Sequence, residues 1–120
     1  MSARRPVRVS ETPLEKDEQA AIVELVETLR GKAWVIGTVR PDGDFRGTCQ
    51  TAGIADLWVT LPAGASSRAI GIWWETKRRK GKRSAAQLDF AEWCIVTGTP
   101  YGYGTCDEFI ARMKIGGWLK

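Results

Sequence analysis

Two carboxylates and one lysine stand out because each lies in or beside a strongly apolar segment. Residues 54–61, IADLWVTL, form an apolar run that Asp56 interrupts with a charge. Residues 68–77, RAIGIWWETK, end in Glu75 and Lys77, which share one side of an extended strand because side chains alternate between its faces. A buried, unpaired carboxylate costs on the order of several kcal/mol. Asp56 and Glu75 on neighbouring strands could therefore share a divalent cation beside Lys77. The plainer alternative is an exposed Glu75–Lys77 pair and an Asp56 that caps a turn.

The composition narrows the chemistry that such a site could perform. The sequence contains no histidine, which excludes Ser-His and Cys-His nucleophiles and most catalytic zinc sites. Carboxylates, lysine and a hard cation such as Mg²⁺ remain. A net charge of +4 is compatible with a polyanionic partner. Three widely spaced cysteines without a C-x-x-C pair favour reduced thiols over structural zinc; they are Cys49, Cys94 and Cys106.

The elements that would position these groups follow from periodicity, caps and turn residues. A length of 120 residues predicts one domain, at residues 12–120, behind a flexible basic arm at residues 1–11. The order α-β-β-β-α-β-α predicts an α/β fold with a mixed central sheet flanked by helices. We expect a helix from Thr12 that stops at Gly31, strands at 33–39, 54–61 and 68–77, a helix from Ser84 to Gly98, a strand near 101–104 and a helix over about 107–115.

A series of short motifs resembles one known family. In order and spacing, G-x-x-D at 53–56, E-x-K at 75–77 and G-K-x-S-x-x-Q at 81–87 resemble the VRR-NUC (virus-type replication-repair nuclease) family of the PD-(D/E)xK nuclease superfamily. The resemblance covers roughly residues 13–115. It departs from the family at Ala55, where proline is usual, but that residue does no chemistry. The resemblance implies a restriction-endonuclease-like fold.

The resemblance also implies roles for individual residues. Asp56, Glu75 and the backbone carbonyl of Thr76 would bind Mg²⁺ or Mn²⁺, and Lys77 would orient or help deprotonate the attacking water. Such an ion lowers the pKa of its bound water and neutralises phosphate oxygens, which helps a hydroxide to approach an anionic phosphodiester. Gln87 would reach the phosphate or the metal-bound water, although it could equally complete a capping box with Ser84.

A further acidic ligand is expected from the first helix, where two residues compete. The resemblance favours Glu15, which also stands at the capping-box position for Thr12. The amphipathic pattern favours Glu18, which lies between Leu14 and Ile22 where a core residue would be expected.

Basic and aromatic residues suggest how nucleic acid would bind. The run from Lys77 to Arg83 leaves the predicted site directly, and such residues contact phosphates without reading sequence. Six tryptophans are most simply core residues, but one could be a platform for base stacking and Trp118 could belong to a subunit interface. The candidate DNA-binding residues are Arg78, Arg79, Lys80, Lys82 and Arg83.

We therefore expect a Mg²⁺-dependent, structure-selective DNA endonuclease that leaves 5′-phosphate and 3′-hydroxyl ends. By size and resemblance, we expect a homodimer that cuts branched DNA such as four-way (Holliday) junctions in DNA repair. The apolar runs are far shorter than a membrane span, and no hydrophobic region follows the charged N-terminus as it would in a signal peptide. We therefore expect a cytoplasmic protein without membrane contact, of phage or bacterial origin. The alternatives are a flap or restriction-type nuclease of the same superfamily and a catalytically inert nucleic-acid-binding module.

Overall fold

The computed structural model describes residues 14–36, 53–64, 67–78 and 81–120. Within these residues the chain has an α/β fold with a four-stranded mixed sheet and three helices, as the sequence predicts. The predicted basic arm at residues 1–11 lies outside the described residues. The elements are α1 (Glu15–Thr28), β1 (Lys32–Val35), β2 (Leu57–Leu61), β3 (Ile70–Thr76), α2 (Ala85–Thr97), β4 (Tyr101–Gly104) and α3 (Cys106–Gly116).

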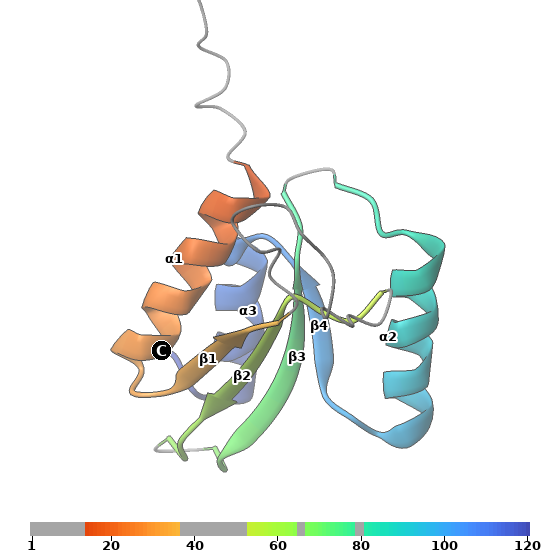
Figure 1. Cartoon of the computed structure of the whole chain (residues 1–120). Helices are drawn as coiled ribbons and strands as arrows, with labels where there is room; N and C mark the ends of the chain where they lie inside the picture. Colours follow the sequence, from red (N-terminus) through yellow and green to blue (C-terminus); the bar gives the residue numbers. More distant parts are fainter. Residues whose placement is uncertain (1–13, 37–52, 65–66, 79–80) are drawn as a thin grey trace, which may run out of the picture.

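The four strands lie side by side in chain order (Figure 1). β1 pairs with β2 and β2 pairs with β3, both in the antiparallel sense. β3 and β4 are parallel, and a parallel pair needs a crossover connection, which α2 supplies. The register pairs Leu57 with Trp74, so Asp56 and Glu75 come next to each other at the end of the β2–β3 pair.

The two faces of the sheet have different partners. Inward-facing residues of β2 and β3 pack against α1 and α3, and Trp74 meets Phe109 edge to face with ring centroids 5.0 Å apart. Each large apolar side chain buried in this way stabilises the fold by roughly 1.5–3 kcal/mol. The buried cluster consists of Ile22, Val26, Leu57, Val59, Leu61, Ile72, Trp74, Phe109 and Met113.

The opposite face of the sheet meets α2. Trp73, which alternates with Trp74 along β3, packs edge to face on Phe90 of α2 with centroids 5.5 Å apart. Trp58 of β2 lies beside Trp73 at 4.8 Å. The sheet therefore separates a layer that contains α1 and α3 from a layer that contains α2.

The ends of α1 differ from the sequence prediction. The helix begins at Glu15 with Leu14 as its N-cap residue, and Leu14 makes no side-chain cap bond and is 42% exposed. The prediction of Thr12 as N-cap is therefore wrong, and Thr12 itself lies outside the described residues. At the other end the left-handed residue is Arg30 (φ 68°) and not Gly31. Gly31 instead lies so close to the Thr60 carbonyl of β2 that a Cβ would clash.

The caps of the other helices satisfy their first backbone amides locally. Ser84 and Gln87 form the predicted capping box of α2, and Gly98 ends that helix in the left-handed conformation. α3 begins one residue earlier than predicted, because Thr105 caps it in a second box with Glu108.

The strands are shorter than their apolar runs. β1 starts at Lys32 and ends at Val35, and β2 starts at Leu57, so Asp56 precedes the strand in place of interrupting it. β3 spans residues 70–76 of the predicted 68–77. Among the helices that the structure describes, none has both the length and the apolar character that crossing a bilayer requires.

Candidate active site

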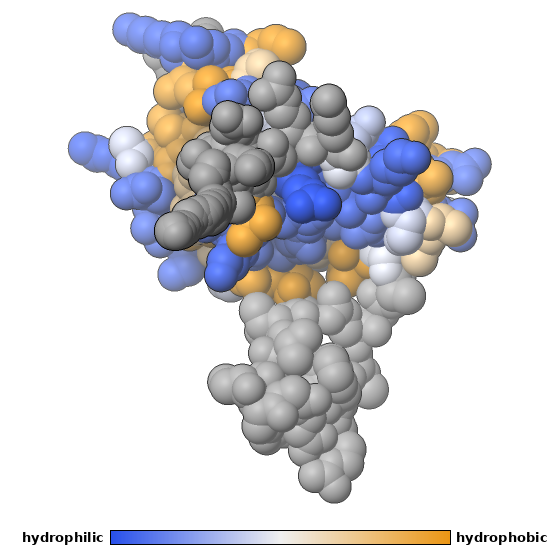
Figure 2. All heavy atoms as spheres, turned by 90° about the horizontal axis from the view of Figure 1, so that it is seen from above, coloured by the Kyte–Doolittle hydropathy of each residue, from blue (hydrophilic) through white to orange (hydrophobic). Residues whose placement is uncertain are grey.

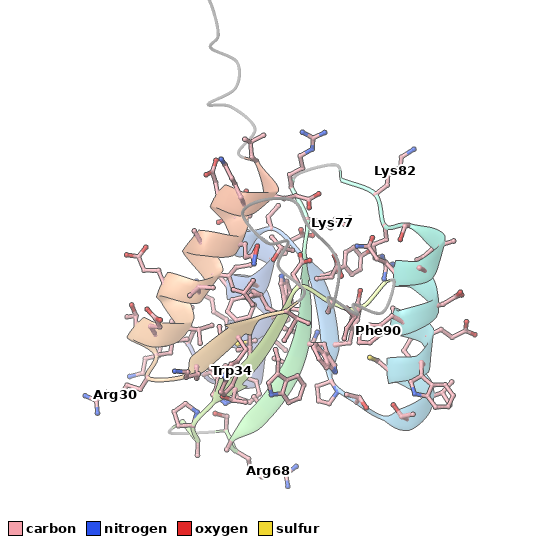
Figure 3. The ribbon with its side chains drawn as sticks, in the orientation of Figure 1. Arg30, Trp34, Arg68, Lys77, Lys82 and Phe90 are labelled. Carbon is pink, nitrogen blue, oxygen red and sulfur yellow. The ribbon has the colours of Figure 1, made fainter. Side chains whose placement is uncertain are left out.

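Three elements converge at one end of the sheet. β3 ends there at Thr76, and the first turns of α1 and α2 lie at the same end (Figure 1). Figure 3 labels Lys77 and Lys82 at this end, whereas Arg30 and Arg68 lie at the opposite end. Seen from above, the described residues at this end are mainly hydrophilic (Figure 2).

Asp56 is fixed by its backbone and by its side chain. Its carbonyl oxygen accepts a hydrogen bond from the Ile36 amide at 2.7 Å, and its carboxylate oxygen Oδ2 accepts one from the Thr76 amide at 2.9 Å. Burial raises the pKa of Asp56, the bond from Thr76 lowers it, and the charge of Glu15 raises it further. The carboxylate thus ties the start of β2 to the end of β3, which is a larger structural role than capping a turn.

Glu75 is almost completely buried, with 2% of its surface exposed. Its Oε2 accepts a hydrogen bond from Gln87 Nε2 at 2.6 Å, whereas its buried Oε1 has no hydrogen-bond partner among the described residues. Burial first and the nearby Asp56 second raise the pKa of Glu75 to about 8, although Lys77 and Arg83 lower it. The exposed Glu75–Lys77 surface pair is therefore excluded as the arrangement of this carboxylate.

Lys77 follows directly after β3. Its backbone amide donates to the Gly104 carbonyl at 3.0 Å, which extends the pairing with β4, and only 9% of its surface is exposed. Its charge lowers the pKa values of both Asp56 and Glu75. Thr76 alternates with these residues and is also buried.

The structure assigns different surroundings to the two acidic candidates of α1. Glu18 Oε1 accepts a hydrogen bond from the Cys106 amide at 2.8 Å, so Glu18 caps the start of α3. Glu15 is the α1 residue whose negative charge raises the pKa values of Asp56 and Glu75. Because α1 begins at Glu15, the capping-box role that the sequence suggested for Glu15 is wrong.

Gln87 connects the start of α2 to the acidic pair. Its Oε1 accepts from the Ser84 amide at 2.8 Å, its amide donates to Ser84 Oγ at 3.1 Å, and its Nε2 donates to Glu75. Gln87 therefore completes the predicted capping box and contacts Glu75 at the same time. Because the Ser84 amide can only donate, it fixes which end of the Gln87 amide faces Glu75.

The basic run divides into exposed and packed residues. Arg78 and Lys82 are exposed, and Arg79 and Lys80 lie outside the described residues. The Arg83 guanidinium lies 3.7 Å from the centroid of the Tyr103 ring, a cation–π contact. Arg83 is thus held near Glu75, where its charge also acts on Tyr101, whose pKa burial raises.

The donors at this end suit a hard cation. Asp56 and Glu75 offer carboxylate oxygens, and Glu75 Oε1 has no partner among the described residues. The charge of Glu15 raises the pKa values of both residues, and the charge of Asp56 also raises that of Glu75. A cation bound between them would offset this repulsion. Within the described ranges, however, no three acidic or thiol side chains are close enough to form a complete ligand cluster. Mg²⁺ commonly takes one or two carboxylates and completes its shell with water and phosphate, so this ion does not require a third carboxylate.

Two further residues support the site, and their residue types alone do not predict it. Gly53 has a φ of 84°, and a Cβ on it would clash with the Ala86 backbone of α2, so only glycine lets the segment before Asp56 reach α2. Tyr103 also contributes, through Arg83. In the sequence, only the G-x-x-D motif at 53–56 indicates that Gly53 belongs to the site.

A separate pocket of about 690 Å³ lies between α2 and α3 beside β4. Arg83 and Tyr103 belong to its lining, but Asp56 and Glu75 do not. The concavity of this region is therefore not the acidic site itself.

Comparison with known families, proteins and structures finds no relative of this chain. No family model matches the sequence, and neither a curated protein nor a solved structure matches the chain.

Proposed function

We propose that this chain is a Mg²⁺-dependent (or Mn²⁺-dependent) endodeoxyribonuclease, a phosphodiester hydrolase of the VRR-NUC type in the PD-(D/E)xK superfamily. The observation that supports this best is the burial of Glu75 next to Asp56, with one Glu75 oxygen that has no partner among the described residues. A buried carboxylate beside a second, partly buried one is unfavourable for the fold on its own, so it favours a role that uses the negative charge.

Each residue of the site has a role in this proposal. Asp56 and Glu75 would hold the cation together with the Thr76 carbonyl, and Glu15 would add negative charge from α1. A bound Mg²⁺ supplies an activated water and neutralises the phosphate. Lys77, largely buried and near both carboxylates, would orient the attacking water and stabilise the developing charge. Gln87 would hold Glu75 in position, because it already donates to Oε2.

The substrate would be branched DNA, with four-way junctions preferred and a homodimer as the active form. A chain of this size carries one such site and can cut one strand, whereas a junction requires two cuts related by a two-fold axis. The exposed Arg78 and Lys82 would contact the phosphates that flank the site.

An inert binding module is the alternative from a different class. A protein that only binds DNA gains nothing from two carboxylates beside the phosphate, because they repel it. The raised pKa of Glu75 near Asp56 therefore favours the enzyme over the binder, and so does Glu75 Oε1, which has no partner in the part of the chain that the structure describes.

The experiment that tests this proposal measures cleavage of supercoiled plasmid and branched DNA with and without Mg²⁺. Asp56→Asn, Glu75→Gln and Lys77→Ala should each lower cleavage by at least ~100-fold, the scale of losing one important catalytic group, while DNA binding persists. Glu92→Gln, on the exposed face of α2, is the matched control and should retain activity. Full activity in any one folded site variant would remove that residue from the mechanism, and no metal-dependent cleavage at all would favour the inert module.

A further inference from the structure

An aromatic row crosses the sheet beside the acidic pair. The strand register pairs Trp34 with Trp58, Trp58 with Trp73, and Trp73 with Tyr101. Residues paired in this way point to the same face of a sheet, so one aromatic side chain from each of the four strands lies on the α2 side. Figure 3 labels Trp34 on the β1 side of the sheet and Phe90 on the α2 side.

The two halves of this row are covered differently. On the β3–β4 half, Phe90 of α2 packs on Trp73 and Tyr101, with ring centroids 5.5 and 6.0 Å apart. On the β1–β2 half, Trp34 is 44% exposed and Trp58 is only partly buried. The Trp58 ring lies against β3 at Gly71, where a Cβ would meet it at 2.5 Å. The absence of a side chain at Gly71 thus lets the indole lie across the sheet.

The position of the row relates it to the acidic pair. Trp58 comes two residues after Asp56 and Trp73 two residues before Glu75, so all four share one face. At about 3.3 Å per residue the row lies roughly 7 Å from the carboxylates along the strands. A group on the aromatic row would therefore be next to the reacting phosphate and not on it.

The charges around the row indicate what would bind there. The Lys32 ammonium lies 5.9 Å from the centroid of the Trp34 ring at the β1 edge, and Lys77 and Arg78 follow the strand end on the other side of the carboxylates. A nucleotide combines a flat base with a phosphate anion, and it suits aromatic faces that have cations nearby. A purely apolar partner would gain nothing from Lys32.

We propose that Trp34 and Trp58 form a stacking site for an unpaired nucleobase that flanks the phosphodiester at Asp56 and Glu75. The site would take the bases of a single strand without regard to sequence, because every base offers a π-face. This inference rests on the proposed function only for its biological substrate. Binding of a single strand to the row requires neither metal nor hydrolysis.

The test measures binding of oligothymidylate and of a matched duplex to the full chain without divalent metal, by fluorescence anisotropy of labelled DNA. Trp34→Ala and Trp58→Ala should each weaken single-strand binding by about 5- to 150-fold, the range for losing one base–aromatic stack. Trp58→Phe should recover most of the loss. Trp93→Ala is the matched control, because Trp93 is 65% exposed on α2 and lies outside the row.

Several outcomes would overturn the stacking site. The first is that Trp34→Ala binds the single strand as tightly as Trp93→Ala does. The second is that Trp34→Ala or Trp58→Ala weakens binding of the duplex as much as binding of the single strand. A third is sedimentation showing that Trp34→Ala dissociates a dimer, which would assign the row to a second copy. Trp34 is exposed, so its truncation should leave thermal unfolding unchanged and keep the test valid if Trp58→Ala fails to fold. If the single strand stacks on the row but no DNA is cleaved, the proposed nuclease is contradicted and the stacking site is not. If DNA is cleaved but the tryptophan variants bind the single strand normally, the stacking site is contradicted and the nuclease is not.

Discussion

At the scale of single residues, Glu75 combines two features that favour opposite protonation states. Its burial and the neighbouring Asp56 favour the protonated carboxyl, whereas a role in metal binding requires the carboxylate. Gln87 donates to one oxygen of Glu75 and leaves the other without a partner among the described residues. Metal and protons should therefore compete for this residue, and the competition should be visible in stability.

The stability of the metal-free protein should fall as the pH rises from about 5 to about 8. The pKa of Glu75 is about 8 in the folded chain and 4.5 as its ordinary value. Between these values the folded state holds a proton that the unfolded state releases. The contribution is thus fully present below 4.5 and is lost as the pH rises through 8. Thermal unfolding with a chelator should show this decrease.

Glu75→Gln is the matched variant for that measurement, because it keeps the shape and removes the titration. Its melting temperature should depend less on pH, and Mg²⁺ at pH 8 should stabilise the natural chain and not the variant. Identical pH profiles for the two proteins would show that Glu75 does not titrate in this range.

At the scale of elements, α1 and α2 each bring a polar group to the sheet. Glu18 of α1 caps α3 through the Cys106 amide, and Glu15 of the same helix lies near the acidic pair. At the start of α2, the Ser84 capping box orients Gln87 toward Glu75. The ends of helices thus hold the fold together and set the electrostatics of the site.

The two acids of α1 should respond differently to substitution. Glu18→Gln removes a charged cap and should lower the free energy of unfolding by about 1 kcal/mol with little change in the Mg²⁺ requirement. Glu15→Gln should leave stability nearly unchanged but raise the Mg²⁺ concentration needed for half-maximal cleavage. Chemical denaturation and a metal titration of both variants check this. The reverse pattern would make Glu18 the acid of the site.

The two capping boxes allow a matched comparison. Ser84→Ala and Thr105→Ala each remove a side-chain cap and should each cost about 1 kcal/mol of stability. Only Ser84→Ala loosens the helix end that carries Gln87, so it should also lower cleavage, whereas Thr105→Ala should not. Denaturation and cleavage assays of both variants in parallel test this. Equal cleavage by the two variants would show that the Ser84 cap has no influence on the site.

The sequence predicts local features of this fold well and tertiary features poorly. The Ser84–Gln87 box and Gly98 follow from neighbouring residues, and the alternation of β3 predicts that Glu75 and Lys77 share a side. By contrast, Glu18 finds its partner 88 residues away, and Gly53 is required by the backbone of α2. Patterns among neighbouring residues could not show either relation, because both depend on how the elements pack.

At the scale of the whole molecule, the proposed site lies at one end of the sheet, with exposed basic residues beside it. Apolar side chains are also exposed on α2 and α3, among them Ile95 (78%) and Ile115 (85%), which line the same pocket. Exposed apolar residues that cluster commonly mark an interaction surface. This surface is compatible with the homodimer that we propose.

A dimer specific for four-way junctions makes two linked predictions. Sedimentation should show two copies, and matched junction, flap and linear duplex substrates should be cleaved in that order of preference. Because each neutralised phosphate steepens the salt dependence, binding should weaken sharply between 50 and 200 mM salt. A monomer that cuts flaps as well as junctions would instead favour the flap-nuclease alternative and leave the metal site unaffected.

The strand order also has a kinetic consequence. β2 and β3 are joined by the short segment 62–69, whereas β4 reaches β3 only after the α2 crossover. Closing the shorter loop costs less entropy, so the hairpin should form before α2 docks. Above pH 8, where Glu75 is a carboxylate even in the folded chain, Asp56 and Glu75 would then face each other as two negative charges before Gln87 arrives, and their repulsion should slow this step. In stopped-flow experiments without metal, Asp56→Asn should refold faster than the natural chain, and Mg²⁺ should accelerate refolding of the natural chain only. Equal refolding rates would show that the two carboxylates come together after the rate-limiting barrier.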